Sequence, residues 1–92
     1  MENLTVLIPF YNEENFLRQS IDRVIASEVA DQIILIDDCS NDDSLNIAKE
    51  ITRDFEFVTL LQSKKNLGKG HALNLAKGFI KTSHVIVHDA DL

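Results

Sequence analysis

The carboxylates of Asp89 and Asp91 follow an apolar run at residues 84–88, and their spacing suits a metal ion. Side chains two residues apart in an extended segment lie on the same side, so the two carboxylates share one face. Hard divalent cations take oxygen ligands of this kind and commonly bridge to phosphate groups. We therefore predict a metal and phosphate site here. The alternative is that both residues only cap the strand or form a turn.

A second acidic pair, Asp37 and Asp38, follows another apolar run. A carboxylate at a strand end can accept hydrogen bonds from ribose hydroxyls or from base N–H groups, and we assign that role to Asp38. The alternative is that the pair, with Asp42 and Asp43, only caps the next helix at its positive end. Cys39 is expected to be a small packed residue, because no base adjoins it in the sequence.

The segment after the first apolar run carries Tyr11, Asn12 and Glu13. Tyr11 could stack on a nucleobase, and Asn12 or Glu13 could hydrogen-bond to it. In the structural alternative, Pro9 stops the strand, Asn12 caps the next helix, and Glu13 and Glu14 occupy its acidic first turn. Taken alone, this segment favours the structural alternative.

Gly68, Lys69 and Gly70 precede a third helical pattern. Two glycines and a lysine at the start of a helix can bind a phosphate group, because free backbone N–H groups, the helix dipole and the lysine ammonium all attract it. The spacing differs from that of a P-loop, so we exclude that motif. A flexible turn with a solvated lysine is the alternative.

Three histidines do not predict a transition-metal site. His84 and His88 would stand about 13 Å apart along an extended strand, too far to share one ion. We expect His71 and His84 to be structural or exposed, and His88 to support the neighbouring carboxylates.

Strands and helices alternate along the chain. Apolar runs predict strands at residues 4–8, 33–36, 57–61 and 85–87, and helical spacing marks residues 16–25, 45–51 and 72–80. Helical connections imply parallel strands, so we predict a three-layer, Rossmann-like α/β fold with helices on both faces and strand order 3-2-1-4. Ligands of such sheets bind at the carboxyl ends of the strands, where the strand order reverses. The polar clusters described above should therefore converge on one crevice between strands one and four.

Composition narrows the function classes. The 92 residues suffice for one small domain, and a net charge of −6 argues against nucleic acid or an anionic membrane as partner. A lone Cys39 fits a reducing, cytoplasmic compartment. No apolar run reaches the roughly 18 residues of a membrane-spanning helix, and the start of the chain is no signal peptide.

Four segments together resemble the nucleotide-sugar half of family 2 glycosyltransferases of the GT-A fold, and among these the dolichyl-phosphate mannose synthase type. They are IPFYNEE (residues 8–14), IDDCSND (36–42), NLGKGHALN (66–74) and DADL (89–92). The resemblance implies an inverting transfer of a sugar from a UDP- or GDP-linked donor to an acceptor, often a polyprenyl phosphate or a glycan.

The resemblance also implies roles for the matched nucleoside-side positions. Pro9, Tyr11 and Glu13 would line the nucleoside pocket, and Asp38 would hold the base or the ribose.

On the phosphate side, Lys69 would lie near the donor phosphates. Asp89 and Asp91 would bind Mg²⁺ or Mn²⁺ together with the diphosphate, whose growing negative charge the metal offsets. Where the family usually has glycine after the paired acids, this chain has Cys39.

The resemblance further implies that residues 1–92 form the donor-binding part only. The acceptor region and the general base are expected beyond Leu92, so this unit should bind a nucleotide weakly and transfer nothing. The full-length protein could act at the cytosolic face of a membrane. We expect the exposed edge of the fourth strand to promote self-association.

Two rival functions remain. One is a non-catalytic α/β module that binds a nucleotide or a protein. The other is a phosphoacceptor receiver domain. Receiver domains typically carry acidic residues after the first and third strands, whereas Pro9 and Ser63 stand at these places here, so this function is disfavoured.

Overall fold

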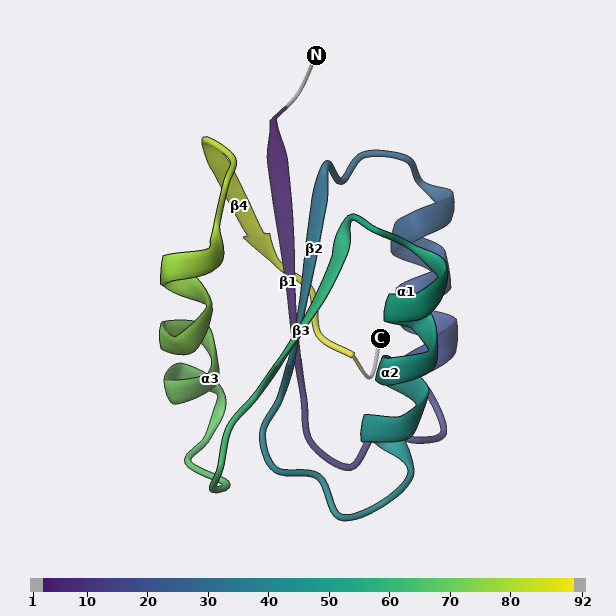
Figure 1. Ribbon diagram of the computed structural model, residues 1–92, viewed down its shortest axis with the longest axis vertical. Helices are drawn as coiled ribbons and strands as arrows, with labels where there is room; N and C mark the ends of the chain where they lie inside the picture. The colour runs from purple at the N-terminus through teal and green to yellow at the C-terminus, as the bar shows by residue number, and fades with distance from the viewer. Residues whose placement is uncertain (1–2, 91–92) are drawn as a thin grey trace.

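Four strands alternate with three α-helices within residues 3–90, the part of the chain that the computed structural model describes (Figure 1). The strands are β1 (Leu4–Phe10), β2 (Gln32–Asp37), β3 (Val58–Gln62) and β4 (His84–Val87). The helices are α1 (Leu17–Ala26), α2 (Ser44–Asp54) and α3 (Lys69–Ala76), and a short 3₁₀ helix, η1 (Lys77–Phe79), follows α3. The predicted α/β alternation is confirmed.

The sheet is parallel throughout, and its order, β3-β2-β1-β4, is the predicted one. Leu7 of β1 lies opposite Ile34 of β2 on one side and opposite Val87 of β4 on the other. Every residue of β2 is buried, because this strand has a neighbour on each side and helices over both faces. That burial explains why its apolar run shows no polar alternation.

Helices cover both faces of the sheet, as predicted: α1 and α2 on one, α3 on the other (Figure 1). Alternate residues of β1 divide between the two cores. Val6 and Ile8 pack in the core beneath α1 and α2, whereas Leu7 packs with Ala72 and Ala76 of α3. The period of two along the strand therefore sets the three layers.

Pro9 does not stop the first strand, as the sequence suggested, because β1 continues to Phe10. The carbonyl of Leu7 accepts a hydrogen bond from the N–H of His88, 2.9 Å away, on the β4 side. In a strand, the backbone groups of residues two apart point toward the same neighbouring strand. The nitrogen of Pro9 therefore points toward the β4 side, at a level beyond Val87, where β4 ends. A proline there removes no ladder hydrogen bond.

The predicted cap of the first helix is wrong. Helix α1 begins at Leu17 and not after Asn12, so Glu13 and Glu14 lie in the preceding loop. Helix α2 begins at Ser44, and its N-cap position is taken by Asp43, one of the acids that the capping alternative named. The side chain of Asn12 bonds to the loop after β2 instead of to its own helix, whereas Oδ1 of Asp42 accepts a hydrogen bond from the N–H of Ser44, the first residue of α2.

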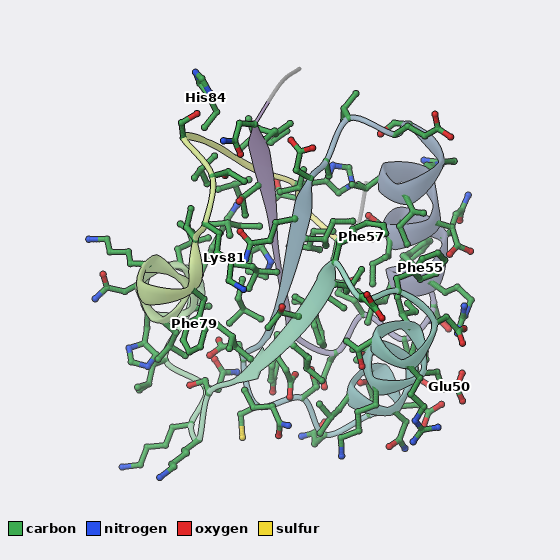
Figure 2. All side chains as sticks on the ribbon, turned by 45° about the horizontal axis from the view of Figure 1, so that its top comes forward. Glu50, Phe55, Phe57, Phe79, Lys81 and His84 are labelled. Atoms are coloured by element: carbon green, nitrogen blue, oxygen red, sulfur yellow. The ribbon has the colours of Figure 1, made fainter. Side chains whose placement is uncertain are left out.

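A buried glutamine fixes the connection from α3 to β4 at the amino end of the sheet. The Oε1 atom of Gln32 accepts hydrogen bonds from the Thr5 hydroxyl (2.7 Å) and from the N–H of Lys81 (3.0 Å). Its Nε2 donates to the carbonyl of Phe79 at 2.8 Å. Figure 2 shows Phe79 and Lys81 on this connection. The network sets where β4 starts, and β4 in turn delivers Asp89 to the other end of the sheet.

Strand β4 is exposed along its whole length. Val85, Ile86 and Val87 are 41%, 50% and 45% exposed. Within residues 3–90, β4 pairs with β1 on one edge, and no strand pairs with its other edge. Self-association through this edge stays a prediction.

The helices are short. The longest, α2, has 11 residues, whereas a helix needs about 20 to cross a bilayer. None of the helices in the described part of the chain is long and apolar enough to span a membrane.

Candidate functional site

A small cavity lies where the carboxyl ends of β1 and β2 meet the start of α3 and the segment after β4. Its volume is about 110 Å³. It is lined by Pro9, Phe10, Tyr11, Asp38, Lys69, Ala72 and Asp89. In Figure 1 β1 and β2 run in the same direction, so their carboxyl ends share one edge of the sheet. Five residues that the sequence analysis singled out therefore line one cavity.

A second hollow of about 330 Å³ shares several of these walls and adds Glu13 and Ala90. Asn12 lines neither hollow. Asp91, the second acid of the predicted metal pair, lies outside the described residues. The structure thus brings Glu13 close to the cavity and leaves Asn12 apart from it.

Asp38 holds the loop that leads into α3. Its side chain is buried, and its two carboxylate oxygens accept hydrogen bonds from the N–H groups of Leu67 (3.2 Å) and Gly68 (2.9 Å). Gly68 has φ +92°, a conformation that glycine adopts readily and other residues rarely do. The backbone N–H of Asp38 donates to the carbonyl of Phe10 at 2.9 Å, which ties the carboxylate to the end of β1. Asp38 therefore places Lys69, the residue after Gly68, at the cavity.

Asp37 has a local structural role. Its Oδ1 accepts a hydrogen bond from the N–H of Ser40 at 3.0 Å, and the residue is buried. Between them Cys39 has φ +67°, in the left-handed region that favours glycine. Cys39 is exposed, and its Sγ lies 3.6 Å from the carbonyl oxygen of Lys64. The expectation of a packed cysteine is wrong, because the tight turn points this side chain outward.

Asn12 joins the loop after β1 to the loop after β2. Its N–H donates to the Ser40 hydroxyl at 3.0 Å, and its Oδ1 accepts from the N–H of Asn41 at 2.9 Å. Asn12 has φ +51°, which asparagine tolerates better than most residues. Tyr11, which precedes Asn12, is 40% exposed at the cavity. The reciprocal pair of hydrogen bonds fixes the backbone that carries Tyr11.

Two further hydrogen bonds extend this contact between the loops. The N–H of Glu13 donates to the Ser44 hydroxyl at 2.8 Å, and the N–H of Glu14 donates to Oδ2 of Asp42 at 3.3 Å. Desolvation is the largest single influence on the pKa of Asp42 and raises it. The hydrogen bonds from Ser44 and Glu14 together outweigh desolvation, so the pKa of Asp42 lies below its ordinary value of 3.8. The loop contact is therefore strongest when Asp42 is ionised.

Lys69 and Asp89 form an ion pair across the cavity, with Nζ 2.5 Å from Oδ1. The two side chains are 53% and 48% exposed. Asp89 follows His88, whose Nε2 lies 2.9 Å from the hydroxyl of the buried Ser20 on α1. His88 therefore attaches the segment after β4 to α1. The sequence analysis expected His88 to support the neighbouring carboxylates, but its ring bonds to the Ser20 hydroxyl.

The family of the chain follows from its sequence. The sequence model described as "Glycosyl transferase family 2" matches residues 5–92. The chain belongs to glycosyl transferase family 2. The expected family is thus confirmed, whereas its dolichyl-phosphate mannose synthase-like subtype stays a proposal.

Curated relatives of this family 2 chain are much longer than it is. An undecaprenyl-phosphate 4-deoxy-4-formamido-L-arabinose transferase of Edwardsiella ictaluri is 35% identical over 97% of this chain and 29% of its own length. A poly-beta-1,6-N-acetyl-D-glucosamine synthase of Staphylococcus aureus is 32% identical over 99% of this chain and 22% of its own length. The chain spans less than a third of the length of the curated relatives it matches.

Solved structures of glycosyltransferases share the fold. A mannosyltransferase from Pyrobaculum calidifontis, in complex with GDP-Man and Mn²⁺, superposes with a TM-score of 0.88 at 24% identity, over 97% of this chain and 27% of that one. TarS of Staphylococcus aureus gives 0.85 at 25% identity, over 99% of this chain and 28% of that one. The described residues therefore have the expected Rossmann-like fold, which these GT-A glycosyltransferases share.

The described residues offer no preformed metal cage. Within residues 3–90, no three His, Cys, Asp or Glu side chains gather in a way that would hold a metal ion. Mg²⁺ is commonly held by only one or two carboxylates together with substrate phosphates. The half-exposed carboxylate of Asp89, on the cavity wall, fits the part of one such ligand.

Sequence reasoning missed three features of this family 2 site. They are the reciprocal hydrogen bonds between Asn12 and the loop at residues 40–41, the hydrogen bond from the N–H of Gly68 to Asp38, and the ion pair of Lys69 with Asp89. Ser, Asn and Asp in both loops were a usable signal for the first, because these side chains bond readily to nearby backbone. The other two join residues 20 to 30 positions apart and leave no local pattern.

Proposed function

We propose that residues 1–92 form the donor-binding part of a metal-dependent, inverting glycosyltransferase that takes its sugar from a nucleoside diphosphate sugar. The observation that carries the proposal is the cavity at the carboxyl edge of the sheet, where Tyr11, Asp38, Lys69 and Asp89 meet. An aromatic ring, a carboxylate acceptor, a cation and a second carboxylate are the groups that a nucleoside diphosphate requires. Membership of glycosyl transferase family 2 supports this reading.

The nucleoside is proposed to occupy the side of the cavity formed by the two joined loops. Pro9 and Tyr11 supply its apolar wall, and Glu13 lines the adjoining hollow. Both oxygens of Asp38 already accept a backbone N–H, and each keeps a second lone pair that can accept from a ribose hydroxyl or a base N–H. Asn12 then contributes indirectly, by holding the loop that carries Tyr11.

The diphosphate is proposed to lie between Lys69 and Asp89. The ammonium of Lys69 neutralises part of its charge, and Asp89, with Asp91 outside the described residues, would hold Mg²⁺ or Mn²⁺ against the phosphate oxygens. Such a cation supplies charge stabilisation to the departing nucleoside diphosphate. A mannosyltransferase of the same fold was solved with GDP-Man and Mn²⁺, and TarS with UDP and with UDP-GlcNAc, which supports a donor of this class.

The acceptor is proposed to be a polyprenyl phosphate, by analogy with the undecaprenyl-phosphate sugar transferase that is 35% identical. Relatives named as a teichoic acid poly(glycerol phosphate) polymerase and a poly-beta-1,6-N-acetyl-D-glucosamine synthase favour a cell-wall or surface glycan as the second candidate. The proposal gives donor-side roles to the carboxylates of Glu13, Asp38 and Asp89 and leaves the general base unassigned.

Calorimetric titration of the 92-residue chain with UDP and with GDP, each with and without Mn²⁺, tests the proposal. We expect one nucleotide to bind, and to bind about tenfold more tightly with Mn²⁺. Asp89→Asn should remove most of the metal effect, whereas Asp22→Asn, an equal charge change on the exposed side of α1, should leave it. A preference for GDP favours the dolichyl-phosphate mannose synthase-like subtype. No binding of either nucleotide in any combination contradicts the proposed function.

A further inference from the structure

Lys69 and Asp89 neutralise each other across the cavity, although the proposed function gives them different partners. Their charged atoms are 2.5 Å apart. The other ion pair among residues 3–90, between Arg18 and Glu50, joins α1 to α2. A divalent cation that binds Asp89 therefore competes with the ammonium of Lys69 for the same carboxylate.

We propose that Lys69 is an exchangeable counterion that couples metal binding to donor binding. Lys69 pairs with Asp89 when no diphosphate is present, and turns to the diphosphate when the donor enters. Asp89 then binds a divalent cation more readily when the donor is present. This inference rests on the proposed function, because the exchange needs a diphosphate to receive the lysine.

The exchange requires a side-chain rotation and no backbone movement. The backbone before Lys69 is held by the hydrogen bond from Gly68 to Asp38, and the segment of Asp89 is held by the contact of His88 with Ser20. Both charged side chains are about half exposed, so water solvates either one when the pair separates. Exposed pairs of this kind shift an equilibrium by about fivefold at most, so a diphosphate can displace the carboxylate readily.

The charges at the cavity explain why a lysine is needed there. Glu13, Asp38 and Asp89 bring three carboxylates to the two hollows, in a chain whose net charge is −6. No other Lys or Arg among the described residues lines the two hollows, so without Lys69 they would attract free cations and repel a diphosphate. The positive charge of Lys69 weakens the binding of free cations and attracts the diphosphate. By linkage, a lysine that releases Asp89 on donor binding raises the affinities of donor and cation for one another by the same factor.

Binding of Mn²⁺ alone, measured by water-proton relaxation on the full 92-residue chain, tests the exchange without any catalytic assay. Lys69→Met should bind Mn²⁺ alone about three- to fivefold more tightly than the wild type. The same variant should bind UDP or GDP without metal about fivefold more weakly. Lys77→Met removes an equal charge from an exposed position just after α3 and should change either affinity less than about twofold.

A double variant tests whether the increase in Mn²⁺ affinity comes from Asp89. In Lys69→Met/Asp89→Asn the tighter Mn²⁺ binding should disappear, because the carboxylate released by the first change is gone. Circular dichroism of each variant checks that the fold is kept. If the wild type binds a nucleotide with Mn²⁺ but Lys69→Met binds Mn²⁺ alone no more tightly, the exchange is overturned and the proposed function stands. If the wild type binds no nucleotide under any condition, both are overturned.

Discussion

Replacing Asp38 by asparagine should destabilise the protein through the loop that enters α3. The buried carboxylate accepts the N–H groups of Leu67 and Gly68, and each hydrogen bond to a charged group is worth about 1.5–3 kcal/mol. An Asn side chain keeps one carbonyl acceptor and turns its NH₂ group, a donor, toward the second N–H. One hydrogen bond is lost and two donors face each other. We therefore expect the free energy of unfolding to fall by about 2–3 kcal/mol.

Urea unfolding followed by far-UV circular dichroism measures this loss. For a chain of this size, the same change corresponds to a melting temperature lower by about 10–20 °C. Asp22→Asn, an equal charge change at an exposed position on α1, should stay within about 0.5 kcal/mol of the wild type. If Asp38→Asn unfolds at the same urea concentration as Asp22→Asn, the carboxylate does not hold this loop and our account of how Lys69 is placed is wrong.

Three further predictions concern the loops and the sheet edge. Cys39→Gly should raise the free energy of unfolding by about 0.5–1 kcal/mol, because it relieves a left-handed residue at φ +67°; Cys39→Ala keeps that conformation and should bring no gain in urea unfolding. The pKa of Asp42 is lowered by folding, so its contribution is present above its unfolded value of 3.8 and is lost as the pH falls through the folded value. The free energy of unfolding should therefore fall more steeply as the pH drops below about 4 in the wild type than in Asp42→Asn, by about 1 kcal/mol or less for this partly exposed group, and equal slopes would contradict this. Ile86→Lys should reduce self-association in sedimentation experiments, because it charges the exposed β4; a wild type that is monomeric at high concentration would refute the interface itself.

The sheet was predictable because its determinants are local. The unbroken apolar run at residues 33–36 favoured a strand buried on both faces, and helical spacing between the strands favoured parallel connections. The meeting of Tyr11, Asp38 and Asp89 then followed from topology, since the carboxyl ends of parallel strands share one edge.

The caps and the role of Pro9 were not predictable in the same way. The side chain of Asn12 can bond to its own helix or to a neighbouring loop, and the choice depends on where the loop at residues 40–41 lies. Pro9 is compatible with β1 only because β4 ends beside it, and the length of β4 is a property of another segment. The partner of Asn12 and the place of Pro9 in β1 both depend on contacts between residues distant in sequence, which a local sequence pattern does not reveal.

A nucleotide should bind at the carboxyl edge of the sheet, and its position on the chain can be mapped. Amide chemical shifts of the ¹⁵N-labelled chain can be followed by NMR during titration with the Mg²⁺ complexes of UDP and GDP. We predict that the largest shifts fall on Tyr11, Asp38, Lys69 and Asp89, which line the cavity at the carboxyl edge of the sheet. Saturable binding with its largest shifts on the amino-end network around Gln32 would contradict it.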